Sequence, residues 1–226
     1  MSKTILSKQI PVTVYIYKSD PATTPGRQHE LGQELLKTAL INEGILQYEL
    51  RRSKKGKPLI YAPGTLPDAK RQDLQSSYGH APEESPSEIC HASISHTAGF
   101  VVCALCADRP VGVDVEIPGG HKLSASQMRR TEKKLLKREF ETEPTSVLAV
   151  ADEPKLHDRI LRFYERWTLA EAFGKMKGAG LAFSEDYDAI IAHPHETRRF
   201  ENAILTVLAE GAKQESLQIE WKEISI

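Results

Sequence analysis

Two carboxylates stand two residues apart in the segment Gly-Val-Asp-Val-Glu at positions 112–116. If this segment is a strand, successive side chains alternate between its faces, so that Asp114 and Glu116 share one face and the valines the other. Carboxylates this close repel one another unless water, a proton or a cation separates them. Oxygen ligands of this kind suit Mg²⁺, which keeps waters and phosphate oxygens as further ligands. A solvated strand face is the alternative, and the spacing alone favours it.

A second group of polar residues is spaced for one face of a helix. Trp167, Glu171 and Lys175 follow one another at intervals of four, so they lie on the same side. As an exposed ion pair, Glu171 and Lys175 would contribute only about 0.3–0.5 kcal/mol, and the helix taken alone favours this simple interpretation. The other face is apolar and is expected to pack on the core; it consists of Leu169, Ala172, Phe173 and Met176.

Two further segments could hold phosphate. The segment Ser-Ile-Ser-His-Thr-Ala-Gly at 93–99 ends a strand-like run with hydroxyls and a histidine, His96, and such groups can bind phosphate oxygens. A single histidine is, however, more often a structural residue. Lys57 follows Lys-Lys-Gly at 54–56, which fits either a phosphate-binding loop or an ordinary exposed turn.

Hydrophobic periodicity predicts the elements that must position these residues. The order expected is strand, helix, three short antiparallel strands, two helices and three strands, which indicates an α+β fold. We expect two similar halves, 1–118 and 119–226, each with a helix packed on an antiparallel sheet of three or more strands and with the site at their interface. The expected strands are 10–17, 89–96, 100–107, 109–117, 187–192, 199–209 and 216–224. The expected helices are 29–49, as one helix or as two interrupted at Gly44, 124–141 and 158–177.

Composition excludes several classes of protein. The 226 residues carry a formal net charge of -1, which argues against a surface built wholly for nucleic acid. The basic run at 51–57 also lacks the interleaved aromatic residues of a nucleic-acid-binding module. No apolar run approaches the roughly 20 residues that span a bilayer, and the three cysteines form no disulfide framework. We therefore expect a soluble cytoplasmic protein with reduced, buried thiols and no membrane partner.

Four motifs in order resemble the 4'-phosphopantetheinyl transferase superfamily. They are Gly-Lys-Pro at 56–58, the serine–histidine segment at 93–99, the acidic segment at 112–116 and Trp-Thr-Leu-Ala-Glu-Ala-Phe-Gly-Lys-Met-Lys-Gly-Ala-Gly-Leu at 167–181. The closer resemblance is to the single-chain, pseudo-dimeric type, which activates carrier proteins of non-ribosomal peptide, polyketide or fatty-acid synthesis. The resemblance covers somewhat over half of the chain, from Lys57 to Leu181.

The resemblance implies an activity and a set of roles. The family transfers phosphopantetheine from coenzyme A to a serine of an apo acyl or peptidyl carrier protein and releases 3',5'-ADP. Displacement at phosphorus depends mainly on positioning and charge neutralisation, with a divalent ion bridging phosphate oxygens. Asp114, Glu116 and Glu171 match the Mg²⁺-binding acids, and Glu171 also matches the proposed base for the incoming serine. Lys175 matches a lysine that contacts phosphate.

Further residues match positions that hold coenzyme A or the carrier protein. Lys57, Ser95 and His96 match ligands of the nucleotide and its phosphates, and Lys37 of the first helix lies near a position where the family often has a basic phosphate ligand. Acidic carrier proteins could dock on the basic side of helix 124–141, although a solvated helix face explains the same charges. That side carries Arg130, Lys134, Lys137 and Arg138. A pseudo-duplicated chain can complete its site alone, so we expect a monomer.

The sequence departs from the family pattern in two places. Ala170 stands where the family usually has a lysine, which removes one positive charge, and the segment 61–88 is longer than usual. We expect that long segment to border the coenzyme A or carrier-protein site. The alternative function is a relative that binds coenzyme A or a carrier protein without transfer.

Overall fold

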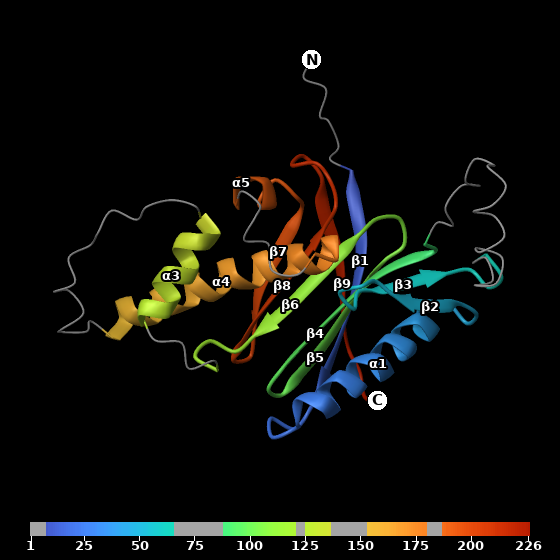
Figure 1. The fold of residues 1–226 in the computed structure, drawn as a ribbon, viewed down its shortest axis with the longest axis horizontal. Helices are drawn as coiled ribbons and strands as arrows, with labels where there is room; N and C mark the ends of the chain where they lie inside the picture. Colours follow the sequence, from blue (N-terminus) through green and yellow to red (C-terminus); the bar gives the residue numbers. More distant parts are fainter. Residues whose placement is uncertain (1–7, 66–87, 121–124, 137–152, 180–186) are drawn as a thin grey trace, which may run out of the picture.

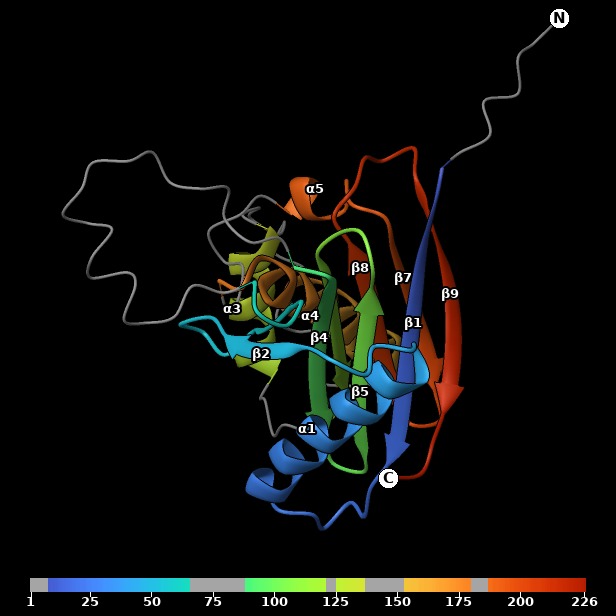
Figure 2. The same cartoon turned by 90° about the vertical axis from the view of Figure 1, so that its right-hand side faces the viewer.

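Two β-sheets packed face to face form the centre of the molecule, with α1 and α4 flanking the pair (Figures 1 and 2). The computed structural model describes residues 8–65, 88–120, 125–136, 153–179 and 187–226. Its elements in chain order are β1 (Gln9–Lys18), α1 (Pro25–Asn42), β2 (Glu49–Arg52), β3 (Pro58–Tyr61), β4 (Cys90–Thr97), β5 (Phe100–Cys106), β6 (Val111–Glu116), α3 (Ala125–Leu136), α4 (Glu153–Lys177), α5 (Tyr187–Ile190), β7 (His195–Phe200), β8 (Ala203–Ala209) and β9 (Ser216–Glu223).

The larger sheet is mixed and the smaller one is antiparallel. Six strands lie in the order β2-β3-β4-β5-β1-β9, in which only β9 runs parallel to its neighbour, β1. The second sheet has the order β6-β8-β7. The predicted α+β class is therefore confirmed. Within the described ranges, no helix is long and apolar enough to cross a membrane.

An apolar layer fills the space between the sheets. Alternate residues of β1 and β5 point into it from the larger sheet, and alternate residues of β6 and β8 from the smaller one. The other residues of β5 pack beneath α1. Because β5 is covered on both faces, all seven of its residues are buried, and this explains its uninterrupted apolar sequence. Cys103 and Cys106 face opposite layers, so the C-x-x-C spacing does not bring their thiols together.

Each sheet contains a strand from the other part of the chain. The first-half strand β6 pairs with β8, and the last strand, β9, pairs with β1. The three strands expected in sequence after residue 89 are present, but only β4 and β5 pair with each other. The third strand, β6, packs against β4 but pairs with β8 in the smaller sheet, because the side-chain pattern of a strand does not indicate its partner. The division at residue 118 stays a prediction.

Two serine hydroxyls of β4 accept hydrogen bonds from backbone N–H groups along the outer edge of β6. Ser93 Oγ accepts a hydrogen bond from the Val113 N–H at 3.0 Å, and Ser95 Oγ accepts one from the Val115 N–H at 3.4 Å. An edge strand leaves every second N–H without a partner from its own sheet, and buried N–H groups need one. The two serines therefore anchor β6 against the larger sheet.

The first helix is displaced from the predicted range 29–49. It begins at Pro25, after Thr24 accepts a hydrogen bond from the Arg27 N–H, and it ends before Gly44, which has a positive φ of 77°. Such a glycine commonly terminates a helix. Residues 49–61 instead form the β2–β3 hairpin, which turns at Gly56. This hairpin was not predicted, because its strands are only four residues long and show too little alternation.

The C-terminal elements correct two further predictions. The strand expected at 187–192 is wrong, since Tyr187–Ile190 forms the short helix α5, which buries Ile190 beneath α4. The strand expected at 199–209 is a hairpin of β7 and β8 that turns at Glu201, whose φ is 53°. Of helix 124–141 only the part to residue 136 is described, so Lys137 and Arg138 lie outside the described residues, as do 66–87 of the long segment.

β6 and α4 meet at Gly112. A Cβ atom at this position would lie 1.9 Å from the carbonyl oxygen of Ala172. Only glycine, which has no side chain, therefore lets the backbone of α4 come this close to the strand that carries Asp114.

We predict that Gly112→Ala strongly destabilises the fold, because the new methyl group would meet backbone rather than a mobile side chain. The expected loss is about 3 kcal/mol or more, which corresponds to a fall in Tm on the order of 10 °C. Thermal unfolding measures it. The control is Gly26→Ala in the first turn of α1, where a Cβ atom would have no neighbour within 4 Å. Equal Tm values for the two variants would contradict the close approach of α4 to β6.

Candidate active site

Asp114 lies on the face of β6 that points away from the apolar layer, and its side chain is only 4% exposed. Its Oδ1 atom accepts hydrogen bonds from Ser95 Oγ at 2.8 Å and from Lys175 Nζ at 2.6 Å. Its Oδ2 atom is buried without a hydrogen-bond partner among the described residues. A buried carboxylate is costly unless its charge is compensated, so Lys175 provides the counter-charge in this structure.

Ser95 connects the two sheets and α4. Its hydroxyl donates to Asp114, accepts from the Val115 N–H, and accepts from Lys175 Nζ at 2.7 Å. The side chain is buried, and the hydroxyl is therefore fully engaged within the protein. In this structure these contacts hold Asp114 and Lys175 in place, and the predicted phosphate contact of Ser95 stays a prediction.

Two features fix α4 over β6 and bring Glu171 and Lys175 to Asp114. The first is the close approach at Gly112. The second is a buried hydrogen bond of 2.7 Å between the hydroxyls of Thr168 on α4 and Thr206 on β8. The predicted apolar face of this helix packs as expected in a buried cluster, whose members include Leu169, Ala172, Phe173 and Met176.

Glu171 is a carboxyl group with a strongly altered acidity. Burial is the main cause, and the negative charge of Asp114 adds to it, while Lys175 opposes and Glu116 adds a smaller contribution; together they raise the pKa of Glu171 to about 7. The three acids predicted to bind metal are therefore close enough to influence one another. A carboxyl group with a pKa near 7 is also suited to take up a proton at neutral pH.

The acids do not form a ready-made metal site. Within the described residues, no three side chains of His, Cys, Asp or Glu are gathered closely enough to hold a metal ion. The partnerless Oδ2 of Asp114 and the mutual influence of the carboxylates nevertheless fit a divalent cation. The ammonium group of Lys175 lies against the same carboxylate, at Oδ1.

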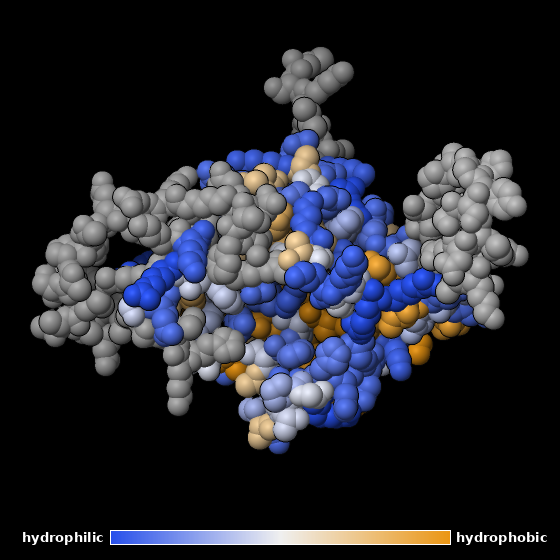
Figure 3. Space-filling model, viewed as in Figure 1, coloured by the Kyte–Doolittle hydropathy of each residue, from blue (hydrophilic) through white to orange (hydrophobic). Residues whose placement is uncertain are grey.

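A pocket of about 260 Å³ opens beside these residues. Figure 3 shows apolar surface in a hollow bordered by hydrophilic residues near the middle of this face. Of the residues that the structure describes, four cationic side chains, two histidines and no carboxylate line the pocket, which suits an anionic ligand. Its lining from α1, the β2–β3 hairpin, β4 and α4 is His29, Gln33, Arg52, Lys55, Gly56, Lys57, Pro58, Ser93, Ile94, His96, Gly174, Lys175 and Gly178.

The pocket brings together some of the predicted ligands but not all of them. Lys57, His96 and Lys175 line it, whereas Lys37 is exposed on α1 and is not part of its lining. Lys57 Nζ donates to the carbonyl oxygen of Met176 at 2.7 Å, which ties the hairpin to the end of α4. Burial lowers the pKa of Lys57. Burial also lowers the pKa of His96, with the charge of Lys175 as the next cause.

Three residues of the pocket, Arg52, His29 and Gln33, were not predicted, and the role of Lys55 was left open between a phosphate-binding loop and an exposed turn. Arg52 and Lys55 belong to a basic run whose function was left open, because its folding into a hairpin beside β4 was not foreseen. His29 and Gln33 are one helical turn apart on α1, and this spacing was the available signal. Gln33 also accepts a hydrogen bond from Arg52 and so joins α1 to the hairpin.

Ala170 points into the core rather than into the pocket. Its side chain is fully buried in the apolar cluster beneath α4. Trp167, at the start of the same motif, stacks on Phe163 with ring centroids 6.1 Å apart. A lysine at position 170 would need a different local packing, so its absence leaves no gap in the wall of the pocket.

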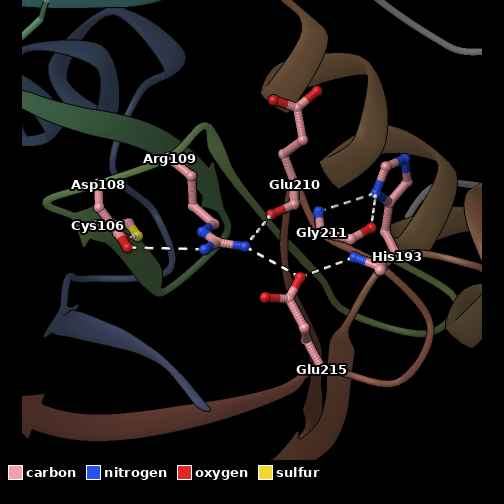
Figure 4. Close-up of polar contacts among 8 residues, drawn as sticks. Cys106, Asp108, Arg109, His193, Glu210, Gly211 and Glu215 are labelled. Atoms are coloured by element: carbon pink, nitrogen blue, oxygen red, sulfur yellow. Dashed lines mark hydrogen bonds and ion pairs between the residues drawn. The ribbon is translucent and has the colours of Figure 1, made fainter. Parts of the chain in front are cut away.

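The two histidines at 193 and 195 contact backbone groups. His193 Nδ1 lies 3.1 Å from the Gly211 carbonyl oxygen and 3.3 Å from the Gly211 N–H (Figure 4). Beside them Arg109 Nη1 donates to Glu215 Oε2 at 3.1 Å and to the Glu210 carbonyl oxygen at 3.2 Å. These contacts join the turn before β6 to the turn before β9. They therefore connect the two strands that pair with the other part of the chain.

A family model matches residues 110–222, half of the chain, and its description is the 4'-phosphopantetheinyl transferase superfamily. The chain belongs to this superfamily. Membership implies a transferase of the phosphopantetheinyl type. The matched residues include Asp114, Glu116, Glu171 and Lys175 of the transferase, and the residues of the pocket contributed by α1, the hairpin and β4 precede the match. No curated protein sequence is similar enough to the chain to count as a match.

We predict that Ser95→Ala destabilises the protein by about 1–3 kcal/mol, since it leaves the Val115 N–H and Asp114 short of a buried partner. Urea unfolding measures the loss. Ser19→Ala is the matched control, because the Ser19 hydroxyl has no hydrogen-bond partner among the described residues. The role given to Ser95 is wrong if both variants unfold at the same urea concentration.

Proposed function

We propose that the protein transfers the 4'-phosphopantetheine group of coenzyme A to a serine of an apo acyl or peptidyl carrier protein and releases 3',5'-ADP. One observation carries the proposal. Among the described residues, a pocket lined by four cations and no carboxylate opens beside a partly buried group of interacting acids. Coenzyme A is strongly anionic at its nucleotide end, and displacement at phosphorus needs this combination of positive charge and metal-binding acids.

The pocket supports binding of the nucleotide end of coenzyme A. Lys175 stands at the end nearest the acids and would meet the pyrophosphate. Arg52 and Lys55 come from the hairpin and would meet the separate 3'-phosphate. Guanidinium groups suit phosphate because they donate in a planar fork, and the hydrogen bond from Arg52 to Gln33 already orients that side chain.

The acids support the chemical step. Asp114, Glu116 and Glu171 would hold Mg²⁺, which when bound polarises phosphate oxygens and neutralises developing charge. The serine oxygen forms a bond to the phosphorus next to pantetheine, and the bond from that phosphorus to the bridging oxygen breaks, so that 3',5'-ADP leaves. Glu171 takes the serine proton. Such a positioned base typically contributes about 10²–10⁴ in rate.

The topology supports the single-chain type of the superfamily. In each part of the chain a helix, α1 or α4, packs on a β-hairpin, and the strand that follows the hairpin joins the other sheet. This reciprocal exchange is what two related halves in one chain would produce, and it would let a monomer complete its site. For the carrier protein we propose the basic side of α3, where Arg130 and Lys134 are exposed. A basic face speeds encounter with an acidic partner.

We predict that an apo acyl carrier protein gains one phosphopantetheine group when incubated with this protein, coenzyme A and Mg²⁺. Intact mass spectrometry detects the gain. Omitting Mg²⁺ or introducing Glu171→Gln should reduce the rate by at least about 10². Glu165→Gln on the same helix is the control, since Glu165 pairs with Arg199 at the surface. No gain with fatty-acid, peptide or polyketide carriers, while coenzyme A still binds, would favour a binding protein over a transferase.

We predict that Arg52→Ala raises the KM for coenzyme A by about tenfold, the effect of losing roughly 1.4 kcal/mol of binding, with kcat little changed. The KM for dephospho-coenzyme A, which lacks the 3'-phosphate, should change much less. Steady-state kinetics with both substrates tests this. The neighbouring exposed Arg51 lies on the other face of β2, and Arg51→Ala serves as the control. An equal rise in both KM values would place Arg52 elsewhere on the ligand.

A further inference from the structure

Lys175 belongs to both parts of the site. Its ammonium group contacts Asp114 and Ser95 in the acidic cluster, and its side chain also lines the pocket. Asp114, Glu116 and Glu171 are not part of the pocket lining. Lys175 therefore stands between the place for the metal and the place for the phosphate, and its side chain is 30% exposed and able to turn toward the pocket.

The contact with Asp114 has an electrostatic cause. A carboxylate that is 4% exposed needs a positive neighbour, and Lys175 is the only lysine or arginine in a salt bridge with Asp114 among the described residues. A divalent cation at the same carboxylate would supply that charge instead. A cation at the partnerless Oδ2 and the ammonium group at Oδ1 would then share one carboxylate, and their like charges would repel each other at this short distance.

We propose that Lys175 neutralises Asp114 in the metal-free protein, and that binding of Mg²⁺ displaces the Lys175 ammonium group into the pocket, where it becomes available to the phosphates of coenzyme A. The proposal rests on the proposed function, because it assumes that these acids bind Mg²⁺. Under this proposal Mg²⁺ and coenzyme A bind cooperatively. Bound Mg²⁺ places the Lys175 ammonium group in the pocket, and the phosphates of coenzyme A stabilise the lysine there. Such coupling is reciprocal by thermodynamic necessity.

The displaced lysine explains two observations at once. The acids influence one another electrostatically and yet are not gathered as a metal site, because the lysine holds Asp114. Ser95 is the second anchor of the lysine in this structure. When Lys175 leaves, Ser95 still donates to Asp114 and accepts from the Val115 N–H, so the carboxylate keeps its orientation for the metal.

The first test follows the lysine in the unmodified chain. The protein is briefly acetylated with and without Mg²⁺ at equal ionic strength, in the absence of coenzyme A and carrier protein, and mass spectrometry measures the modification of each lysine. We expect Mg²⁺ to raise the rate at Lys175 at least about fivefold. The rate at Lys177 should not change, because its amine pairs with Glu210 at 2.7 Å, outside the acidic cluster.

The second test measures the competition directly. Calorimetric titration with Mg²⁺ compares the unmodified protein with Lys175→Met. Without the competing ammonium group, the Kd for Mg²⁺ should fall at least about fivefold. Lys177→Met is the matched control and should leave the Kd unchanged. If Lys175→Met fails to fold, the acetylation experiment on the unmodified protein still decides the matter.

The outcomes separate this proposal from the proposed function. If Mg²⁺ leaves the acetylation of Lys175 unchanged, or does not bind, the displacement is wrong, and metal-dependent transfer to a carrier protein would show that the proposed function stands without it. If Mg²⁺ exposes Lys175 but no carrier protein is modified, the displacement holds and the proposed function is wrong.

Discussion

The contact between the buried Asp114 carboxylate and the Lys175 ammonium group is the interaction on which the site depends. It joins β6, a strand at the edge of the smaller sheet, to the end of α4, and Ser95 of the larger sheet completes it. Three separate elements thus meet at one carboxylate. Because an uncompensated buried charge is costly, the fold must keep a cation at this point, and the function proposed here uses a cation at the same point.

Strand pairing and helix packing bring β4, β6 and α4 together at Asp114. β6 leaves its chain neighbours and joins the other sheet, and the serine hydroxyls of β4 satisfy the N–H groups along its outer edge. Gly112 then allows the backbone of α4 to approach the strand. Just before Gly112 in the chain, Arg109 ties together the turns that precede β6 and β9 (Figure 4).

The pocket follows from the same arrangement. The hairpin of β2 and β3 extends the larger sheet beyond β4, and Lys57 fastens its turn to the last turn of α4. The contact between the hairpin and α4 brings the cationic side chains of both elements around one pocket. The structure thus places a cationic hollow beside a group of acids. This arrangement suits a reaction in which an anion must be brought to a metal, because the two charges are kept apart until the ligand joins them.

The sequence by itself determined the α+β class, the buried strands β1 and β5, the helix that carries Glu171 and Lys175, and the family, because periodicity and motif order are local properties. It failed where local patterns are ambiguous: β2 and β3 are too short to show alternation, and α5 was mistaken for a strand. The tertiary structure alone decided that β6 leaves its neighbours, that Ser95 faces Asp114, that Ala170 is buried, and that Arg52 and Lys55 join the pocket while Lys37 does not. Those outcomes depend on strand pairing and on helix packing, which bring together residues far apart in the chain.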